Sequence, residues 1–218
     1  VCKRESCWMR QKFMKGKLNT ELKSYTFAPK SPTIWHKDPN TWLTSVDIEK
    51  VMKQYEKKYQ QFEFLGPSPI DFDTHKLYGE CVWEELCKFQ LSDFLKRGKR
   101  KIGVIFNLDP HYKEGSHWVS LFVDTQKKFI FFFDSTGDAI PGRIDKLVKR
   151  IIKQGTQVNI DFGKTIINDK EHQMEDTECG VYSLNFIISM IKGVDPLKIL
   201  NERISDKAME RLRKVYFN

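Results

Sequence analysis

The sequence lacks any apolar run that approaches the roughly 18–20 residues needed to cross a bilayer, so no membrane-spanning helix is predicted. No signal peptide is visible at its start. Cysteine is scarce and odd in number, and no Cys or His pairs have the spacing of metal-ligand sites. These absences predict a reducing compartment, no disulfide framework, no metal site and no cofactor. The five cysteines are Cys2, Cys7, Cys81, Cys87 and Cys179.

The composition is that of a folded chain with a basic surface. Apolar residues make up 40% of the 218 positions and aromatic residues 13%, which argues against disorder. The net charge of +8 indicates either contact with nucleic acid or an acidic partner, or simply a solvated lysine-rich surface. Residues 1–40 are basic and poorly periodic, so we expect an N-terminal extension there and one domain over 41–218.

A cysteine lies where a polar loop gives way to an apolar helical pattern. Residues 171–178 are almost entirely polar, and apolar residues recur at helical spacing from Val181 to Ile191. Cys179 is therefore predicted in the first turn of a buried helix, where unpaired N–H groups favour thiolate over thiol. The small Gly180 would let another chain approach the sulfur. A buried structural cysteine is the competing interpretation of this segment.

A candidate base and its orienting carboxylate lie in a predicted β-hairpin. His117 opens an alternating run that ends at Asp124, and Phe129–Phe133 forms a second apolar strand followed by Asp134. Pairing through residues 125–128 would place His117 and Asp134 at the same end of the hairpin. Asp124 is the alternative carboxylate at the opposite end, and His111 is the alternative base.

The side chain of Gln173 completes the set of candidate catalytic groups. It lies six residues before Cys179, in the loop that enters the helix. Its amide could donate a hydrogen bond to the same substrate carbonyl that the thiol attacks. A nucleophile, a base, an orienting acceptor and an oxyanion donor are the groups that thiol-dependent acyl transfer requires.

The order and spacing of these motifs resemble the Ulp1/adenain clan of cysteine proteases. His-Trp, then Asp-Ser seventeen residues after the histidine, then Gln-x5-Cys-Gly match the clan, as does the segment Thr41–Met52 with its opening Trp-Leu. The clan includes SUMO-specific proteases and maturation proteases of adenoviruses, poxviruses and African swine fever virus. The likeness covers about residues 41–217, and its later part favours the branch from large DNA viruses.

The resemblance implies a fold and a specificity. It implies an α+β, papain-like fold with a central mixed sheet flanked by helices and the nucleophile at a helix N-terminus. It implies a Cys179–His117–Asp134 triad with Gln173, and substrate held between Trp42 and Trp118. Only small residues fit between two close indoles, so cleavage after Gly-Gly or a similar pair is expected.

The resemblance and the basic charge together leave three functions open. The first is an endopeptidase that processes viral structural precursors, located in the virus factory of the host cytoplasm and in the virion. The second is a protease that removes SUMO or another ubiquitin-like tag in the cytoplasm or nucleus. The third is a non-catalytic basic module that binds nucleic acid. The partner common to the first two is a polypeptide with a Gly-Gly-like site.

Periodicity and turn residues also predict the remaining elements. A helix should start at Ser45 as N-cap, and residues 81–97 show helical spacing. Strands are expected at 62–65, 101–108, 157–160 and 164–167, and helices at 142–154, at 196–203 and after Ser205.

Overall fold

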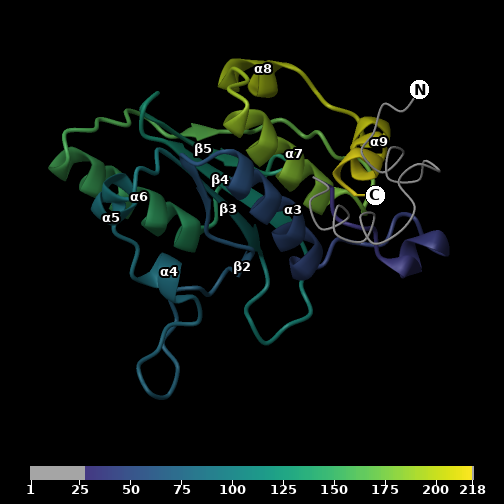
Figure 1. Cartoon of the computed structure of the whole chain (residues 1–218), viewed down its shortest axis with the longest axis horizontal. Helices are drawn as coiled ribbons and strands as arrows, with labels where there is room; N and C mark the ends of the chain where they lie inside the picture. The colour runs from purple at the N-terminus through teal and green to yellow at the C-terminus, as the bar shows by residue number, and fades with distance from the viewer. Residues whose placement is uncertain (1–27, 218) are drawn as a thin grey trace, which may run out of the picture.

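The computed structural model describes residues 28–217, which form a mixed sheet between helices (Figure 1). The six strands are β1 (Phe62–Phe64), β2 (Ser68–Pro69), β3 (Lys101–Asn107), β4 (Trp118–Asp124), β5 (Phe129–Phe133) and β6 (Ile166–Ile167). The helices are η2 (Thr33–His36, a 3-10 turn), α3 (Ser45–Lys58), α4 (Glu84–Cys87), α5 (Leu91–Lys96), α6 (Gly142–Gln157), α7 (Cys179–Ile191), α8 (Pro196–Asn201) and α9 (Asp206–Tyr216).

The sheet has the order β1-β3-β4-β5-β6, and β2 also pairs with β3. The central strands β3, β4 and β5 are antiparallel, whereas β1, β2 and β6 pair in parallel with their neighbours. The predicted α+β architecture with a central mixed sheet is therefore confirmed. No helix within residues 28–217 is both long and apolar enough to cross a membrane.

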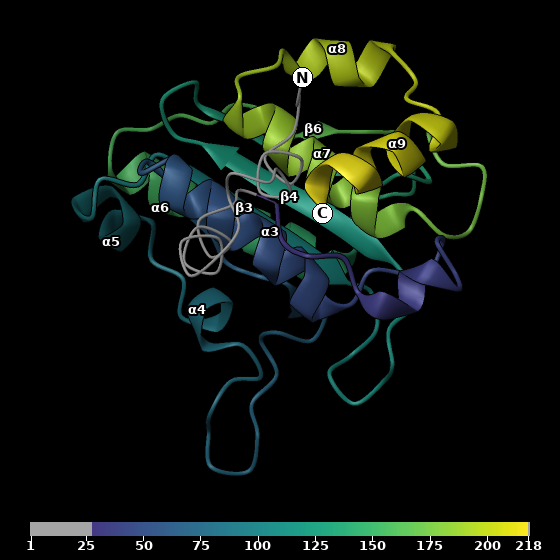
Figure 2. The same cartoon turned by 45° about the vertical axis from the view of Figure 1, so that its right-hand side comes forward.

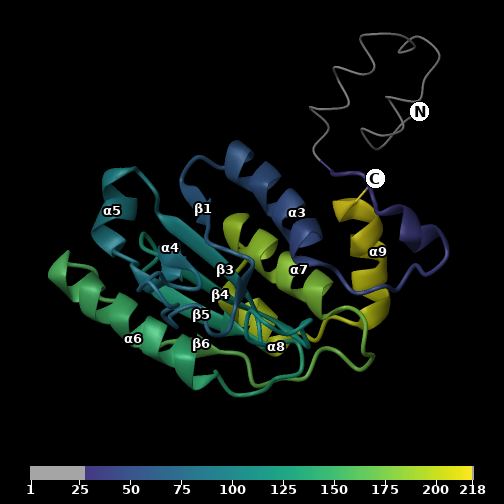
Figure 3. The same ribbon diagram turned by 90° about the horizontal axis from the view of Figure 1, so that it is seen from below.

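Alternating side chains on the central strands pack into two separate hydrophobic cores, one on each face of the sheet. On β4, Trp118 and Phe122 join the core beneath α3, α7 and α9, whereas Val119, Leu121 and Val123 join the core beneath α5 and α6. Figure 3 shows the sheet between these two sets of helices. Because helices cover both faces, all of β4 is buried and its sequence is apolar on both sides apart from Ser120 and Asp124.

One predicted helix cap and one predicted strand are wrong. Thr44, not Ser45, is the N-cap of α3, because its hydroxyl accepts from the Asp47 N–H at 3.3 Å while the Asp47 carboxylate accepts from the Thr44 N–H at 3.0 Å. The expected strand at 157–160 does not form. Helix α6 continues to Gln157, and the N–H groups of Val158 and Ile160 then fold back onto the Gly155 carbonyl.

The absence of a disulfide was also predicted wrongly. Cys81 and Cys87 form a disulfide, with their Cα atoms 6.2 Å apart. We expected helical spacing through 81–97, but Cys81 lies in a β-bridge, residues 82–83 form a bend and α4 is a single turn. That turn brings Cys87 back beside Cys81. Cys179 is a free cysteine, and Cys2 and Cys7 lie outside the described residues.

The part of the predicted extension that the structure describes packs on the domain. Trp35 makes an edge-to-face contact with Phe217, with ring centroids 4.8 Å apart. The Arg213 guanidinium also lies 4.7 Å from the Trp35 ring centroid. Residues 28–40 thus contact the closing helix α9. The rest of the extension, residues 1–27, falls outside the described region.

Candidate active site

Two polar side chains meet at the end of the β4–β5 hairpin. His117 directly precedes β4 and Asp134 directly follows β5, so antiparallel pairing places them side by side. The His117 Nε2 atom is 2.7 Å from Asp134 Oδ1, and Asp134 is only 1% exposed. Thr136 donates to the same oxygen through its N–H at 3.0 Å and its hydroxyl at 2.8 Å. Thr136 therefore holds the Asp134 carboxylate in the position from which it contacts the imidazole.

The thiol of Cys179 reaches the same imidazole from the helical layer. Cys179 is the first residue of α7 and is 2% exposed. Burial alone would lower the pKa of His117, but its hydrogen bonds to Asp134 and Cys179 and their charges outweigh burial and raise that pKa to about 10. Since Asp134 occupies Nε2, Nδ1 is the nitrogen that remains for the sulfur. The arrangement brings the Cys179 sulfur to an imidazole that a carboxylate orients, which is the geometry that thiol-dependent acyl transfer requires.

The alternatives from the sequence lie elsewhere. Asp124 is opposite Lys101 and Phe129 at the far end of the sheet, where it accepts from the N–H groups of Gln126 and Lys127 in the hairpin turn. The imidazole of His111 pairs with Asp71, with Nδ1 and Oδ2 2.7 Å apart. Neither is part of the hydrogen-bonded set around Cys179, so the geometry favours Asp134 and His117.

Gln173 is held by a residue next to Asp134. The Ser135 hydroxyl donates to Gln173 Oε1 at 2.7 Å, and the Gln173 N–H donates to the Ser135 carbonyl at 2.9 Å. Gln173 Nε2 donates one of its hydrogens to the Glu175 carbonyl. Because Ser135 binds the oxygen of the amide, the NH₂ end is fixed as the donor end. Ser135 is a functional candidate that the sequence analysis did not single out.

A buried ion pair anchors the residue before the cysteine. Glu178 and Arg213 are 1% and 4% exposed, and the Arg213 Nη2 and Nε atoms lie 3.1 and 3.2 Å from Glu178 Oε1 and Oε2. Arg213 also donates to the carbonyl of Thr41 at 2.6 Å. One guanidinium therefore joins α9, the start of α7 and the segment that carries Trp42. The sequence offered no signal for this pair beyond the two charges themselves.

The two predicted substrate-binding tryptophans line one cleft. This cleft has a volume of about 540 Å³ and lies between the loops over 70–83 and 108–117, which project from one end of the sheet (Figure 2). Trp118 is buried in the core beneath α3 and α7, and its indole N–H donates to the Leu43 carbonyl at 3.1 Å. Trp42, in contrast, is 43% exposed. Trp42 and Trp118 thus line the same cleft, and Trp118 directly follows His117 in sequence. Their role in holding substrate stays a prediction.

Gly180 has a packing reason of its own. A Cβ atom at this position would lie 3.0–3.2 Å from three side-chain atoms of Leu43. The glycine therefore lets the segment before α3 pack closely on α7. Its predicted role in letting substrate approach the sulfur stays a prediction.

Comparison with known proteins identifies the family. The model of the Ulp1 protease family C-terminal catalytic domain matches residues 94–218, more than half of the chain. The chain belongs to the Ulp1 family of cysteine proteases. A second model, that of the Vaccinia virus I7 processing peptidase, matches residues 23–151 of this Ulp1-family protease.

Two viral proteins illustrate the relationship. The mimivirus protein R355, named as a thiol protease, is 31% identical over 222 residues, which cover 98% of this chain and 68% of R355. The African swine fever virus protein S273R, named as a SUMO-1 cysteine protease, is 27% identical over 183 residues, covering 80% of this chain and 67% of S273R. The Ulp1-family protease is thus a cysteine protease with relatives in large DNA viruses.

Solved structures agree with the fold. The crystal structure of the African swine fever virus pS273R protease matches with a TM-score of 0.75 at 25% identity, covering 100% of this chain and 83% of that one. The yeast Ulp1 protease domain, solved in complex with Smt3, the yeast ortholog of SUMO, matches with a TM-score of 0.57 at 20% identity over 81% of this chain and 75% of that one. The latter likeness supports the fold alone.

Proposed function

We propose that this Ulp1-family protease is an endopeptidase that cleaves after small residues, of Gly-Gly type, and processes viral structural precursor proteins. The observation that carries the proposal is the hydrogen-bonded series from Asp134 through His117 to Cys179 at the start of α7. The names of the viral relatives support the viral setting. The proposed location is the virus factory of the host cytoplasm and the virion.

The proposed reaction proceeds through a thioester. His117 takes the proton of the Cys179 thiol, and Asp134 holds the imidazole in the required tautomer. The thiolate attacks the scissile carbonyl, and the Gln173 amide and the Cys179 N–H stabilise the oxyanion. Loss of one such donor typically raises the barrier by about 3–4 kcal/mol. His117 then protonates the leaving amine, and water hydrolyses the thioester.

The cleft supports the proposed specificity. Trp118 is fixed by its bond to Leu43 and Trp42 presents an exposed ring to the same cleft. A substrate chain that passes between the two indoles would keep only residues without bulky side chains. Trp42→Ala is therefore expected to relax the preference for glycine and lower turnover.

Two similar proteins favour a second candidate function. One is named as a SUMO-1 cysteine protease, and Ulp1 was solved with a SUMO ortholog. The test is a panel of Gly-Gly-X peptides beside SUMO and ubiquitin conjugates. Peptide cleavage after Gly-Gly that Cys179→Ala and His117→Ala both abolish is expected. Cleavage of conjugates without any peptide turnover would favour deconjugation instead.

The basic surface supports one further partner as a proposal. A net charge of +8 would attract nucleic acid through its phosphates. Binding to a DNA duplex of arbitrary sequence should then weaken steeply with added salt. Binding that is absent at low salt would contradict this part of the proposal.

A further inference from the structure

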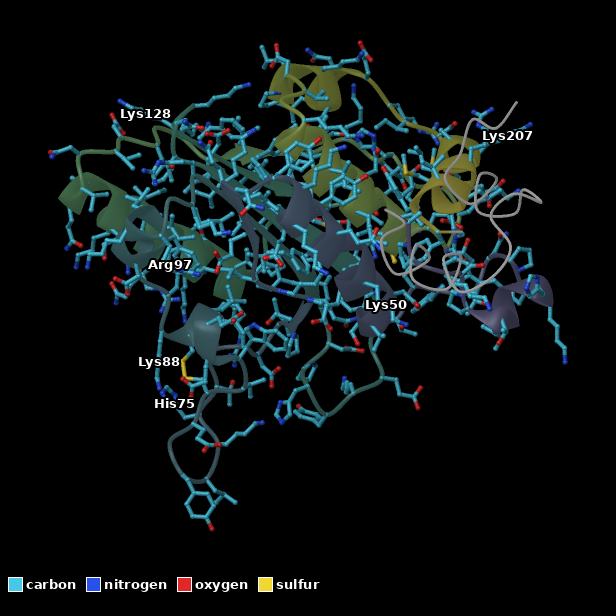
Figure 4. All side chains as sticks on the ribbon, in the orientation of Figure 1. Lys50, His75, Lys88, Arg97, Lys128 and Lys207 are labelled. Atoms are coloured by element: carbon cyan, nitrogen blue, oxygen red, sulfur yellow. A yellow bond between two sulfur atoms is a disulfide. The ribbon has the colours of Figure 1, made fainter. Side chains whose placement is uncertain are left out.

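Three side chains of types that can ligate a metal lie close together at the base of the loop that forms one wall of the cleft. The nearest ligand atoms of His75, Cys81 and Cys87 all lie within 4.8 Å of one another. Figure 4 shows His75 beside the disulfide, below α4. His75, Cys81 and Cys87 follow one another at intervals of six residues, which is not the spacing of a metal-ligand motif, so the sequence predicted no site here. Folding brings them together.

The backbone holds two of the three side chains opposite each other. His75 and Cys81 form an antiparallel bridge, and the flanking N–H groups of Lys76 and Val82 donate to Glu80 and Thr74 at 2.7 and 2.9 Å. Directly opposite residues of such a pair point to the same side. The His75 Nε2 atom is accordingly 3.8 Å from the Cys81 sulfur.

The separation between the His75 and Cys81 ligand atoms fits a tetrahedral ion. With Zn–S near 2.3 Å and Zn–N near 2.05 Å, two ligands at the tetrahedral angle are about 3.6 Å apart. The separation of 3.8 Å between His75 Nε2 and Cys81 Sγ is close to this value. The third ligand, Cys87, returns to the same point at the end of α4, so one ion could contact all three atoms after small side-chain rotations.

We propose that His75, Cys81 and Cys87 form a zinc site when the two cysteines are reduced. An external dithiol supplies two electrons and two protons to the Cys81–Cys87 disulfide, which gives two thiols and the oxidised dithiol. Zinc then binds the two sulfurs and the imidazole, and the thiols release their protons. One imidazole and two thiolates suit zinc, and they leave a fourth position for water or for Glu84, whose Oε1 accepts from the Cys81 N–H at 3.0 Å.

The site would fix one wall of the substrate cleft. Lys76 adjoins His75 in sequence, Val82 adjoins Cys81, and both line the same cleft as Trp42 and Trp118. Trp83, the next residue after Val82, also lines it. The tip of the loop carries Leu77 and Tyr78, which are 97% and 95% exposed. An ion at the base would hold this tip and the adjoining wall in one position, whichever substrate the cleft accepts.

The test uses the 218-residue chain with Cys2, Cys7 and Cys179 replaced by serine, so that Cys81 and Cys87 are the only cysteines left. After reduction, titration with Co²⁺ should give the thiolate-to-cobalt charge-transfer band and the visible bands of a tetrahedral ion. Zn²⁺ should displace the cobalt at one ion per chain. The same protein with its disulfide intact should give no charge-transfer band.

Variants show whether the predicted ligands hold the ion. His75→Asn should weaken zinc binding at least tenfold, since even changes to the partners of metal ligands cost about 10–100-fold. His36→Asn, a change at an exposed histidine elsewhere, should leave binding unchanged. Equal affinity in the two variants, or no charge-transfer band in the reduced protein, would overturn the proposal.

A second measurement needs no variant at the site. Zn²⁺ should protect Cys81 and Cys87 of the reduced unmodified chain from alkylation by iodoacetamide, as read by mass spectrometry of the peptides. Alkylation of both cysteines at the same rate with and without zinc would refute the site even if the variants failed to fold.

Discussion

Ser135 shows how a single residue can set the orientation of the proposed reacting groups. It follows Asp134 directly, and its hydroxyl binds the oxygen of the Gln173 amide at 2.7 Å. One short segment thus supplies the orienting carboxylate and holds the proposed oxyanion donor. The geometry of the site depends on a serine that performs no chemistry itself.

Ser135→Ala should lower kcat by about ten- to a hundredfold with little change in KM, because the Gln173 donor loses its orientation but not its presence. Steady-state kinetics on a Gly-Gly peptide provide the measurement. Ser120→Ala, which removes another buried hydroxyl that bonds to the Ser183 carbonyl and not to Gln173, serves as the control. If Ser135→Ala in a Gln173→Ala background produced a further full loss, the serine would not act through the glutamine.

Asp134→Asn should slow turnover rather than abolish it and should also move the pH profile. The hydrogen bond and charge of Asp134 are among the causes that raise the pKa of His117 to about 10 against burial. Without them the imidazolium loses its proton at lower pH, so the alkaline limb of kcat/KM should shift toward neutrality. An alkaline limb at the same pH in both proteins would contradict this assignment.

At the scale of elements, the ion pair between Glu178 and Arg213 joins α9 to the start of α7. Burial raises the pKa of Glu178, and the adjacent Arg213 opposes that rise. Removing one partner of such a buried pair leaves the other charge without compensation, which typically costs about 3–5 kcal/mol. The pair therefore links the stability of the closing helix to the position of Cys179.

Arg213→Met is expected to lower the free energy of unfolding by about 3–5 kcal/mol, and Glu178→Gln by a similar amount. The double variant should lose less than the sum, since neither charge is then left alone. Urea denaturation monitored by circular dichroism gives these values. Lys198→Ala, which breaks an exposed ion pair with Glu202 in α8, should change little. Strict additivity of the two core substitutions would argue against the pair.

For the molecule as a whole, His172 makes stability depend on pH. It is fully buried, the Ile204 N–H donates to its Nδ1 at 3.2 Å, and its Nε2 lies 3.3 Å from Asn168 Oδ1. Burial, together with the charges of Lys170 and Arg203, lowers the pKa of His172 to about 4. The native state therefore requires a neutral imidazole at this position.

Between pH 6.5 and 4 the unfolded chain binds a proton at His172 that the native state does not, so stability should fall as pH falls through this window. A shift of this size corresponds to about 3 kcal/mol. Urea midpoints at pH 7 and pH 4.5 would measure the loss. His172→Asn should reduce the dependence of the free energy of unfolding on pH between pH 7 and 4.5, whatever its effect on stability at pH 7. An unchanged pH dependence would assign the acid sensitivity to other groups.

Sequence patterns predicted the parts of the site that depend on local periodicity. The alternation after His117, the turn at 125–128 and the apolar strand before Asp134 define a hairpin, and a hairpin has only one way to bring its outer ends together. The helical recurrence after residue 179 likewise placed the cysteine at the start of α7. The resemblance to a protease clan then gave these positions their expected roles.

Contacts between distant segments could not be predicted in this way. Ser135 and Gln173 are 38 residues apart, and Glu178 and Arg213 are 35 apart, so no periodicity relates them. Cys81 and Cys87 were assigned to one helix because apolar spacing does not show where a short helix starts. The cluster with His75 was missed for the same reason.

The thiol and the imidazole belong to different layers of the molecule. Cys179 comes from α7, whereas His117 and Asp134 come from the hairpin of the sheet. Contacts between the two layers, such as the hydrogen bond from Ser183 to the Trp118 carbonyl, keep them together. Mild heating or dilute urea could shift α7 by about an ångström relative to the sheet. The enzyme would then lose activity while its secondary structure persists. Inactivation should accordingly precede unfolding.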